Sequence, residues 1–166
     1  MQKKMGSTGT VVLAGIAGGT VEVVWVMLFC LMSPLQSSLV AEEIARSFLP
    51  QIAGFPALVT GLIIHYALAV LIASMVVMTL LRLLGDRLDM RSVLAVSGAA
   101  LAAIWLTNFF VILPVVNPDF VTLMPYTVTL VSKLGFGISM GWVFGVRITA
   151  SDGRAKYTTH RRLVLR

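Results

Sequence analysis

The chain alternates between four long apolar runs and shorter polar connections. The runs cover residues 10–32, 56–81, 93–113 and 124–146. Each reaches the length of roughly 20 residues that an α-helix needs to cross about 30 Å of hydrocarbon. The pattern therefore predicts an all-α, polytopic membrane protein, a bundle of four transmembrane helices in a single integral membrane domain over residues 1–166.

The connection between the first two runs carries a different pattern. Within residues 39–49, apolar side chains recur at every fourth position, in Val40, Ile44 and Phe48, while charged residues occupy other faces. This spacing is typical of a short amphipathic helix lying on the membrane surface. We predict such a helix in the first external loop, with a plain loop as the alternative. The third run should end at Pro114, because proline interrupts helices.

Composition supports a membrane protein. Hydrophobic residues make up 58% of the chain and charged residues 12%, against roughly 45–50% and 25% in soluble domains. A soluble domain of this size could not bury so much apolar surface. The single cysteine, Cys30, lies inside the first run, so the sequence offers no cysteine pair and no cysteine cluster. We expect neither a metal site nor a bound cofactor.

Lysine and arginine residues outside the runs predict how the chain is threaded. Two lie before residue 10, three in residues 82–91 and six in the polar tail of residues 147–166, whereas Arg46 stands alone in the other connections. The positive-inside rule then places both termini, and the basic tail, in the cytoplasm. Orientation and contact with anionic headgroups account for the formal net charge of +6, so binding to nucleic acid is not expected.

Three ionisable residues interrupt the apolar runs at a similar depth. Glu22 lies 10 residues from the external end of its run, and His65 and Lys133 lie 9 residues from theirs, which is roughly 14–15 Å. A charge near the bilayer centre costs at least roughly 2.5–3.5 kcal/mol, so such residues face the bundle interior and pair. We predict a buried polar cluster of Glu22, His65 and Lys133, with Asn108 at a shallower depth.

Glycines share a helix face with each of the two charged residues. Small residues let two helices approach closely in lipid. We predict that the two faces pack against each other in antiparallel helices, with the ion pair in register. The helix-packing residues are Gly15, Gly18 and Gly19 in the first helix and Gly137, Gly141 and Gly145 in the last.

The main interpretation of Glu22 and Lys133 is a structural ion pair. A proton or ion relay and a contact with a partner subunit are the alternatives. His65 is expected to be a neutral histidine that is hydrogen-bonded to another helix, with a titrating relay as the alternative. No combination of nucleophile and base, no phosphate loop and no metal-ligand spacing can be found in the sequence. We therefore do not expect an enzyme.

The segment AGIAGGTVEVVW at residues 14–25, followed by Ser33-Pro34 and later by Ile64-His65, resembles uncharacterised small four-span inner-membrane proteins of bacteria. The resemblance covers about the first 75 residues. It implies a location in the bacterial plasma membrane, and it implies no activity.

Three functions agree with this pattern. The first is an accessory or structural subunit that packs into a larger membrane complex, with other membrane subunits or a second copy as its partners. The second is a small proton, ion or solute transporter that uses Glu22, His65 and Lys133. The third is a binder of a hydrophobic cofactor such as quinone or haem, with His65 as the polar handle.

Overall fold

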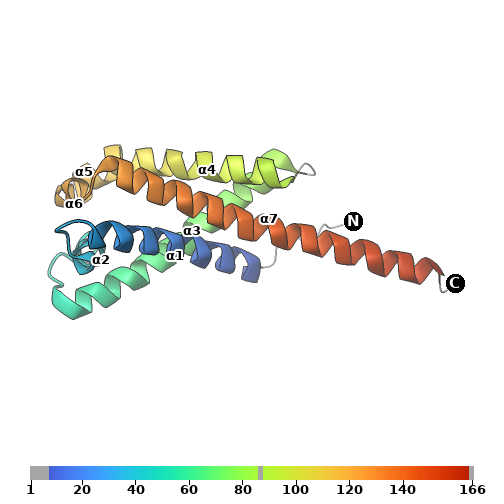
Figure 1. The fold of residues 1–166 in the computed structure, drawn as a ribbon, viewed down its shortest axis with the longest axis horizontal. Coiled ribbons are helices and arrows are strands. Elements are labelled where there is room, and N and C mark those ends of the chain that lie inside the picture. Colours follow the sequence, from blue (N-terminus) through green and yellow to red (C-terminus); the bar gives the residue numbers. More distant parts are fainter. Residues whose placement is uncertain (1–7, 86–87, 165–166) are drawn as a thin grey trace.

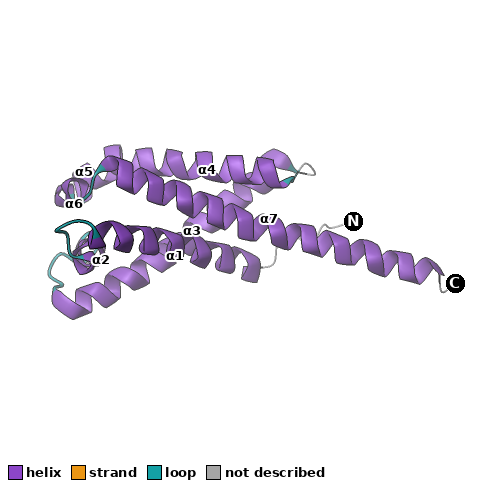
Figure 2. Ribbon diagram, in the orientation of Figure 1, coloured by secondary structure: helices purple, strands orange, loops and turns teal. Residues whose placement is uncertain are grey.

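A computed structural model describes residues 8–85 and 88–164, with side chains up to Ile148. Over these residues the chain forms helices and short connections and no strand (Figure 2). The helices are α1 (Thr8–Leu31), α2 (Ser37–Arg46), α3 (Gly54–Leu84), α4 (Met90–Thr107), a π turn η1 (Asn108–Ile112), α5 (Leu113–Val116), α6 (Pro118–Leu123) and α7 (Tyr126–Val164).

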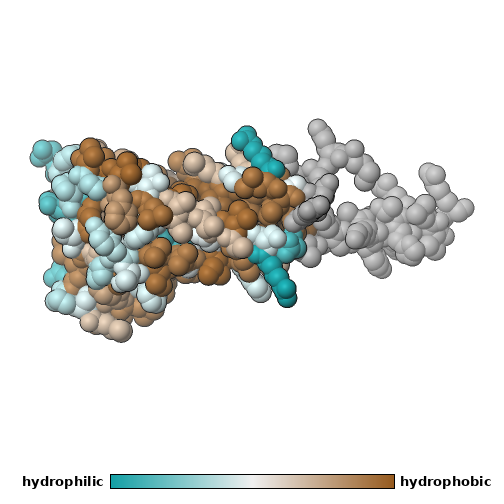
Figure 3. Space-filling model, turned by 90° about the horizontal axis from the view of Figure 1, so that it is seen from above, coloured by the Kyte–Doolittle hydropathy of each residue, from teal (hydrophilic) through white to brown (hydrophobic). Residues whose placement is uncertain are grey.

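Four stretches are long and apolar enough to cross a membrane. They are Thr8–Leu31, Gly54–Leu84, Met90–Val116 and Tyr126–Ile148, and their ends fall within three residues of the four runs in the sequence. Figure 3 shows hydrophobic residues over the middle of one face, with hydrophilic residues gathered towards its two ends. The prediction of an all-α bundle with four such helices is confirmed at this level.

Helix α7 occupies the centre of the bundle, between α1 and α4, while α3 runs obliquely across the other side of α1 (Figure 1). The largest fully buried side chains are Phe136, Met140 and Phe144 of α7, together with Leu80 of α3 and Leu101 of α4. These residues belong to one hydrophobic core. The core therefore forms around α7.

Gly137, Gly141 and Gly145 of α7 do not face α1, so the prediction that the two glycine faces pack together is wrong. A Cβ atom at Gly137 would lie 2.8 Å from the carbonyl oxygen of Ser97 in α4, and Gly141 and Gly145 also face α4. At 3.6 residues per turn, positions four apart advance by more than one full turn. Gly137, Gly141 and Gly145 therefore point in directions that turn progressively around α7, away from the direction of Lys133.

The glycines of α1 pack against two neighbouring helices, α3 and α7. A Cβ atom at Gly15 would lie 2.7 Å from the Cα atom of Val70 in α3, and Gly19 also faces α3. Gly18 faces α7 instead, because a Cβ atom there would lie 2.9 Å from the ring of Phe136. Each face of α1 thus lets a different helix approach closely.

The predicted helix in the first connection exists, and it is packed into the bundle. Its buried residues are Val40, Ala41 and Ala45, and a Cβ atom at Gly61 of α3 would overlap the carbonyl group of Ala41. Phe48, which was expected on the apolar face, lies beyond the end of α2 and is 58% exposed. Close contact between small residues, rather than a stripe of large ones, holds α2 in place.

Pro114 does not end the third long helix, which continues to Val116. The backbone N–H of Leu113 donates to the carbonyl oxygen of Asn108, five residues earlier, within the π turn η1. Proline has no N–H group, and its ring clashes with the carbonyl group four residues before it. A wider turn just before Pro114 accommodates both effects, and the helix goes on.

Asn117 joins the two connections at the end of the bundle that carries α2 and α6, which we call the capped end. Its Nδ2 atom lies 3.2 Å from Oε2 of Glu43 and 3.0 Å from Oγ of Ser47, and its Oδ1 atom accepts the N–H of Phe120. Arg46 pairs with Glu43 and Glu42 on the same side of α2. This network ties α6 to α2.

The basic tail is helical. The sequence predicts a polar tail from residue 147, and α7 continues through it without a break to Val164 (Figure 1). It leaves the bundle at the end where α1 begins, opposite the capped end.

Replacing Gly61 by alanine tests the packing of α2 on α3. The added methyl group would overlap the Ala41 carbonyl group, so we expect the free energy of unfolding to fall by about 1–3 kcal/mol. The measurement is an unfolding titration in detergent micelles. Gly98→Ala is the matched control, because a Cβ atom there meets no atom within 4 Å. Equal effects of the two substitutions would contradict the packing.

Asp89 caps the start of α4, and we predict that this cap makes the stability of the fold depend on pH. It is exposed, and its Oδ2 atom accepts the backbone N–H groups of Arg91 and Ser92 at 3.1 and 3.2 Å. Hydrogen bonds from Ser92, through its side chain and then its backbone, hold the pKa of Asp89 below its usual value. The unfolded chain has the higher pKa, so the cap stabilises the fold at neutral pH and is lost as the pH falls through the lowered pKa.

Asp89→Asn keeps an acceptor at the cap but cannot titrate. We therefore expect the melting temperature of the wild type to fall more than that of Asp89→Asn on acidification. Thermal unfolding at neutral and acidic pH measures the difference. If the melting temperatures of the two proteins fell equally on acidification, the Asp89 carboxylate would not contribute to the pH dependence of stability.

Candidate functional site

The structure brings Glu22 of α1 and Lys133 of α7 together. The Nζ atom of Lys133 lies 2.5 Å from Oε1 of Glu22, and the two side chains are 16% and 11% exposed. Both residues lie well inside their helices, within segments long enough to cross a membrane. The pair is therefore a buried contact between two opposite charges, which connects the first long helix to the last.

Gly18 and Phe136 form the immediate surroundings of the pair. Gly18 stands one turn before Glu22 and leaves room for the ring of Phe136, against which a Cβ atom would lie at 2.9 Å. The Nζ atom of Lys133 lies 6.0 Å from the centroid of the same ring. A ring face at this distance attracts an ammonium group weakly. Lys133 is thus held by one carboxylate and one aromatic ring.

The second oxygen of Glu22 has no hydrogen-bond partner in the described part of the chain. Its Oε2 atom is buried, and no described side chain or backbone group donates a hydrogen bond to it. An unsatisfied buried acceptor costs about 1–3 kcal/mol, and more when it carries charge. Lys133 therefore compensates only part of the carboxylate.

His65 joins α3 to α1, one turn away from the ion pair. Its Nε2 atom lies 3.1 Å from the carbonyl oxygen of Gly19. A carbonyl oxygen can only accept, so Nε2 carries the proton, and Nδ1 keeps its lone pair in the neutral ring. The expected bond to another helix is present. Over the described residues no hydrogen bond or ion pair joins His65 to Glu22 or Lys133.

Two hydroxyl groups lie beside His65. The ring of Tyr66 meets that of His65 edge to face, with the centroids 5.4 Å apart. The hydroxyl group of Tyr66 lies 3.2 Å from Oγ1 of Thr20 in α1. The interface between α1 and α3 thus carries an imidazole and two hydroxyl groups in addition to its close backbone contacts.

Asn108 lies apart from the pair. It is half-buried at the start of η1, near the capped end, and no hydrogen bond of its side chain is found within the described part of the chain. Ser97 of α4, which was not predicted from the sequence, is a further buried polar residue. Its hydroxyl oxygen is fully buried and has no described partner. It faces Gly141, where a Cβ atom would lie 2.9 Å from it. A serine in an apolar run gives no sequence signal that distinguishes it from a packing residue.

Two tryptophans hold the first turns of α7. The indole N–H of Trp25 in α1 donates to the carbonyl oxygen of Val128 at 3.0 Å, and that of Trp105 in α4 donates to Oγ1 of Thr129 at 3.0 Å. Trp105 is buried, whereas Trp25 is 38% exposed. Hydrogen bonds from α1 and from α4 thus fix α7 on two sides.

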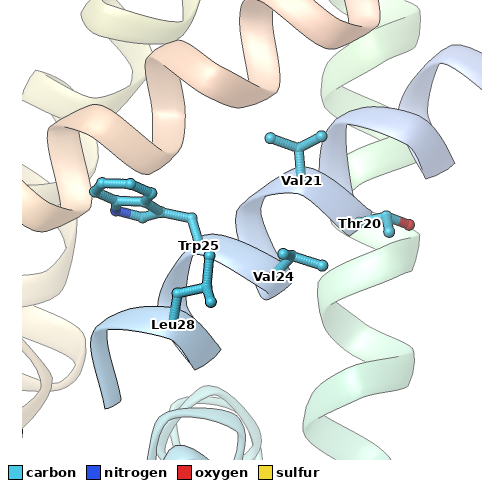
Figure 4. A pocket seen from close by; sticks show the side chains of 5 residues that line it. All are labelled: Thr20, Val21, Val24, Trp25 and Leu28. Atoms are coloured by element: carbon cyan, nitrogen blue, oxygen red, sulfur yellow. The ribbon is translucent and has the colours of Figure 1, made fainter. Parts of the chain in front are cut away.

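A shallow hollow follows the exposed side of α1. Its lining residues all belong to this helix, and Figure 4 shows Trp25 reaching towards α7 and Thr20 towards α3. Its volume is about 230 Å³, and neither Glu22 nor His65 lines it. Among the side chains described in residues 8–85 and 88–148, no group of three histidine, cysteine or acidic residues lies close enough to hold a metal ion. The hollow offers an apolar surface without an ionisable group.

Comparisons of the chain with protein-family models, with curated proteins and with solved structures found no match. The resemblance to small bacterial inner-membrane proteins stays a prediction. Function therefore has to be inferred from the geometry of the chain itself.

A double-mutant cycle tests the ion pair. Glu22→Gln leaves the Lys133 ammonium group buried without a counter-charge, and Lys133→Met leaves the carboxylate, so each substitution should cost about 3–5 kcal/mol of unfolding free energy. The double variant buries neither charge and should recover part of the loss. Unfolding titrations of the four proteins in micelles give the coupling energy. Additive losses would show that the two side chains act independently.

Proposed function

We propose that this chain is a small accessory or structural subunit that packs laterally into a larger membrane assembly, through the side of α4 that faces away from α7. Ala95, Ala99 and Ala103 follow one another at intervals of four along this side, and all three are exposed. Spacing of four places small residues on one helix face. Such faces are typical of helix association in lipid, where close packing rather than hydrophobicity drives contact.

The main support for this proposal is the open space beside Gly98 of α4. A Cβ atom at Gly98 would meet nothing within 4 Å. Packing within the chain therefore does not require a glycine here, although glycine lowers helix stability by about 1 kcal/mol relative to alanine. Eight glycines inside helices, in contrast, meet a neighbouring helix, namely Gly15, Gly18, Gly19, Gly61, Gly135, Gly137, Gly141 and Gly145.

A partner helix accounts for Gly98 and for the alanines beside it. Without a side chain at Gly98, the backbone of α4 is open to another backbone on the side away from the bundle. The partner in the proposal is a transmembrane helix of another subunit or of a second copy. A transporter and a binder of a hydrophobic cofactor have less support, because neither Glu22 nor His65 lines the hollow on α1. Nε2 of His65 is also already engaged by the carbonyl oxygen of Gly19.

The proposed location is the bacterial inner membrane, with both termini in the cytoplasm. The distribution of lysine and arginine supports this orientation, because 11 of the 13 lie before residue 10, in residues 82–91 or after residue 146 of the sequence. The basic extension of α7 then lies along or beyond the anionic cytoplasmic surface. The lipid bilayer and neighbouring membrane subunits are its partners, and no nucleic acid is involved.

Enlarging Ala99 tests the assembly face. Ala99→Leu places a bulky side chain on the exposed side of α4, and we expect it to weaken association by about 10-fold or more, which corresponds to about 1.4 kcal/mol. The measurement is native mass spectrometry after mild detergent extraction from the native membrane. Ala67→Leu, at an exposed alanine of α3, is the matched control. Extraction of the wild type as a monomer, free of other subunits, would refute the proposed function.

A further inference from the structure

We propose that Glu22 is a proton-binding site of the bundle, whose carboxylate takes up one proton at Oε2 while Oε1 remains against Lys133. This site lies where α1 meets α7 and α3, and proton binding there does not depend on the association of α4 with a partner.

The two oxygens of Glu22 differ in their surroundings. Oε1 lies 2.5 Å from the Nζ atom of Lys133, whereas Oε2 is buried and has no described donor. A carboxylate that only links two helices stabilises the contact most when both of its oxygens accept hydrogen bonds. A proton adds almost no volume, so Oε2 can bind it without any cavity beside the pair.

Among the described side chains, the neighbouring helices supply no other cation at this level. Lys133 is the charged group of α7 that faces Glu22. From α3 the titratable groups next to this part of α1 are His65 and Tyr66, at Gly19 and Thr20. From α2 they are Glu42, Glu43 and Arg46, which bind one another at the capped end. A single ammonium group therefore balances the carboxylate, and the open oxygen faces no second positive charge.

The interface between α1 and α3 carries three polar side chains close to the carboxylate, those of His65, Tyr66 and Thr20. His65 donates through Nε2 to Gly19, so Nδ1 retains a lone pair that can accept a proton. Tyr66 and Thr20 have two hydroxyl hydrogens and share one contact at 3.2 Å, which leaves one hydrogen available as a donor. Gly19 and Glu22 are three residues apart on α1, so these groups lie about one helical turn from the carboxylate. The interface between α7 and α4 is closed by backbone contact at Gly137.

The proton transfer balances simply. A hydronium ion gives its proton to the carboxylate, which yields a carboxylic acid and water, and release runs in reverse. Lys133 stays an ammonium group, so the charge of the pair changes from zero to +1. The neutral acid accepts from Lys133 more weakly than the carboxylate does. Proton uptake therefore loosens the contact between α1 and α7.

Infrared difference spectroscopy of the full chain in nanodiscs tests the proposal. We expect a carbonyl stretch of a protonated carboxyl group that grows as the pH falls, shifts on labelling with ¹³C-glutamate and is lost in Glu22→Gln. Glu43→Gln, at the capped end, is the control and should keep this band. A carboxyl signal of Glu22 that stays the same over the whole pH range in which the protein remains folded would overturn the inference.

Lys133→Met provides a second measurement if Glu22→Gln does not fold. Without the ammonium group the carboxylate loses its counter-charge, so the midpoint of the band should shift. An unchanged midpoint would also overturn the inference, because the titrating group would then not be the partner of Lys133. The band should persist in the Ala99→Leu variant, which separates failure of this inference from failure of the proposed assembly.

Discussion

The contact between Glu22 and Lys133 is the constraint on which the bundle depends. Either charge alone inside an apolar segment would be costly, and together they require that α1 and α7 lie side by side with these two residues at the same level. Gly18 makes the approach possible, because it leaves the space that the ring of Phe136 fills. The same arrangement leaves one carboxylate oxygen unsatisfied. The pair is thus both the main link between the two helices and the place where the interior is least completely satisfied.

The other contacts of α7 follow from its position between α1 and α4. Its large side chains fill the core, and its glycines admit the backbone of α4. Tryptophans from both neighbours donate hydrogen bonds to its first turns. Helices in lipid gain little from hydrophobic burial against each other, so close packing and hydrogen bonds hold them together. One side of α4 packs against α7, and its other side is lined by small residues against which a further helix can pack closely.

Much of this arrangement could be predicted from local patterns. Run lengths located the four long helices to within three residues, and the scarcity of charges in those runs pointed to Glu22, His65 and Lys133. The patterns failed where a feature depends on the helix opposite. Ser97 and Asn117 were missed, because their importance comes from Gly141 and Glu43, which lie far away in the sequence. Pro114 was misread, because a π turn before it absorbs the disruption.

The sequence by itself determined which segments are helices long enough to cross a membrane, and which charges had to be buried, because length and hydrophobicity act locally along the chain. Only the tertiary structure decided which helix each glycine serves. The stripe on α7 turns away from Lys133 towards α4, and α1 divides its glycines between α3 and α7. A helix presents every direction around its axis, and the choice among them depends on how all four helices fill space together.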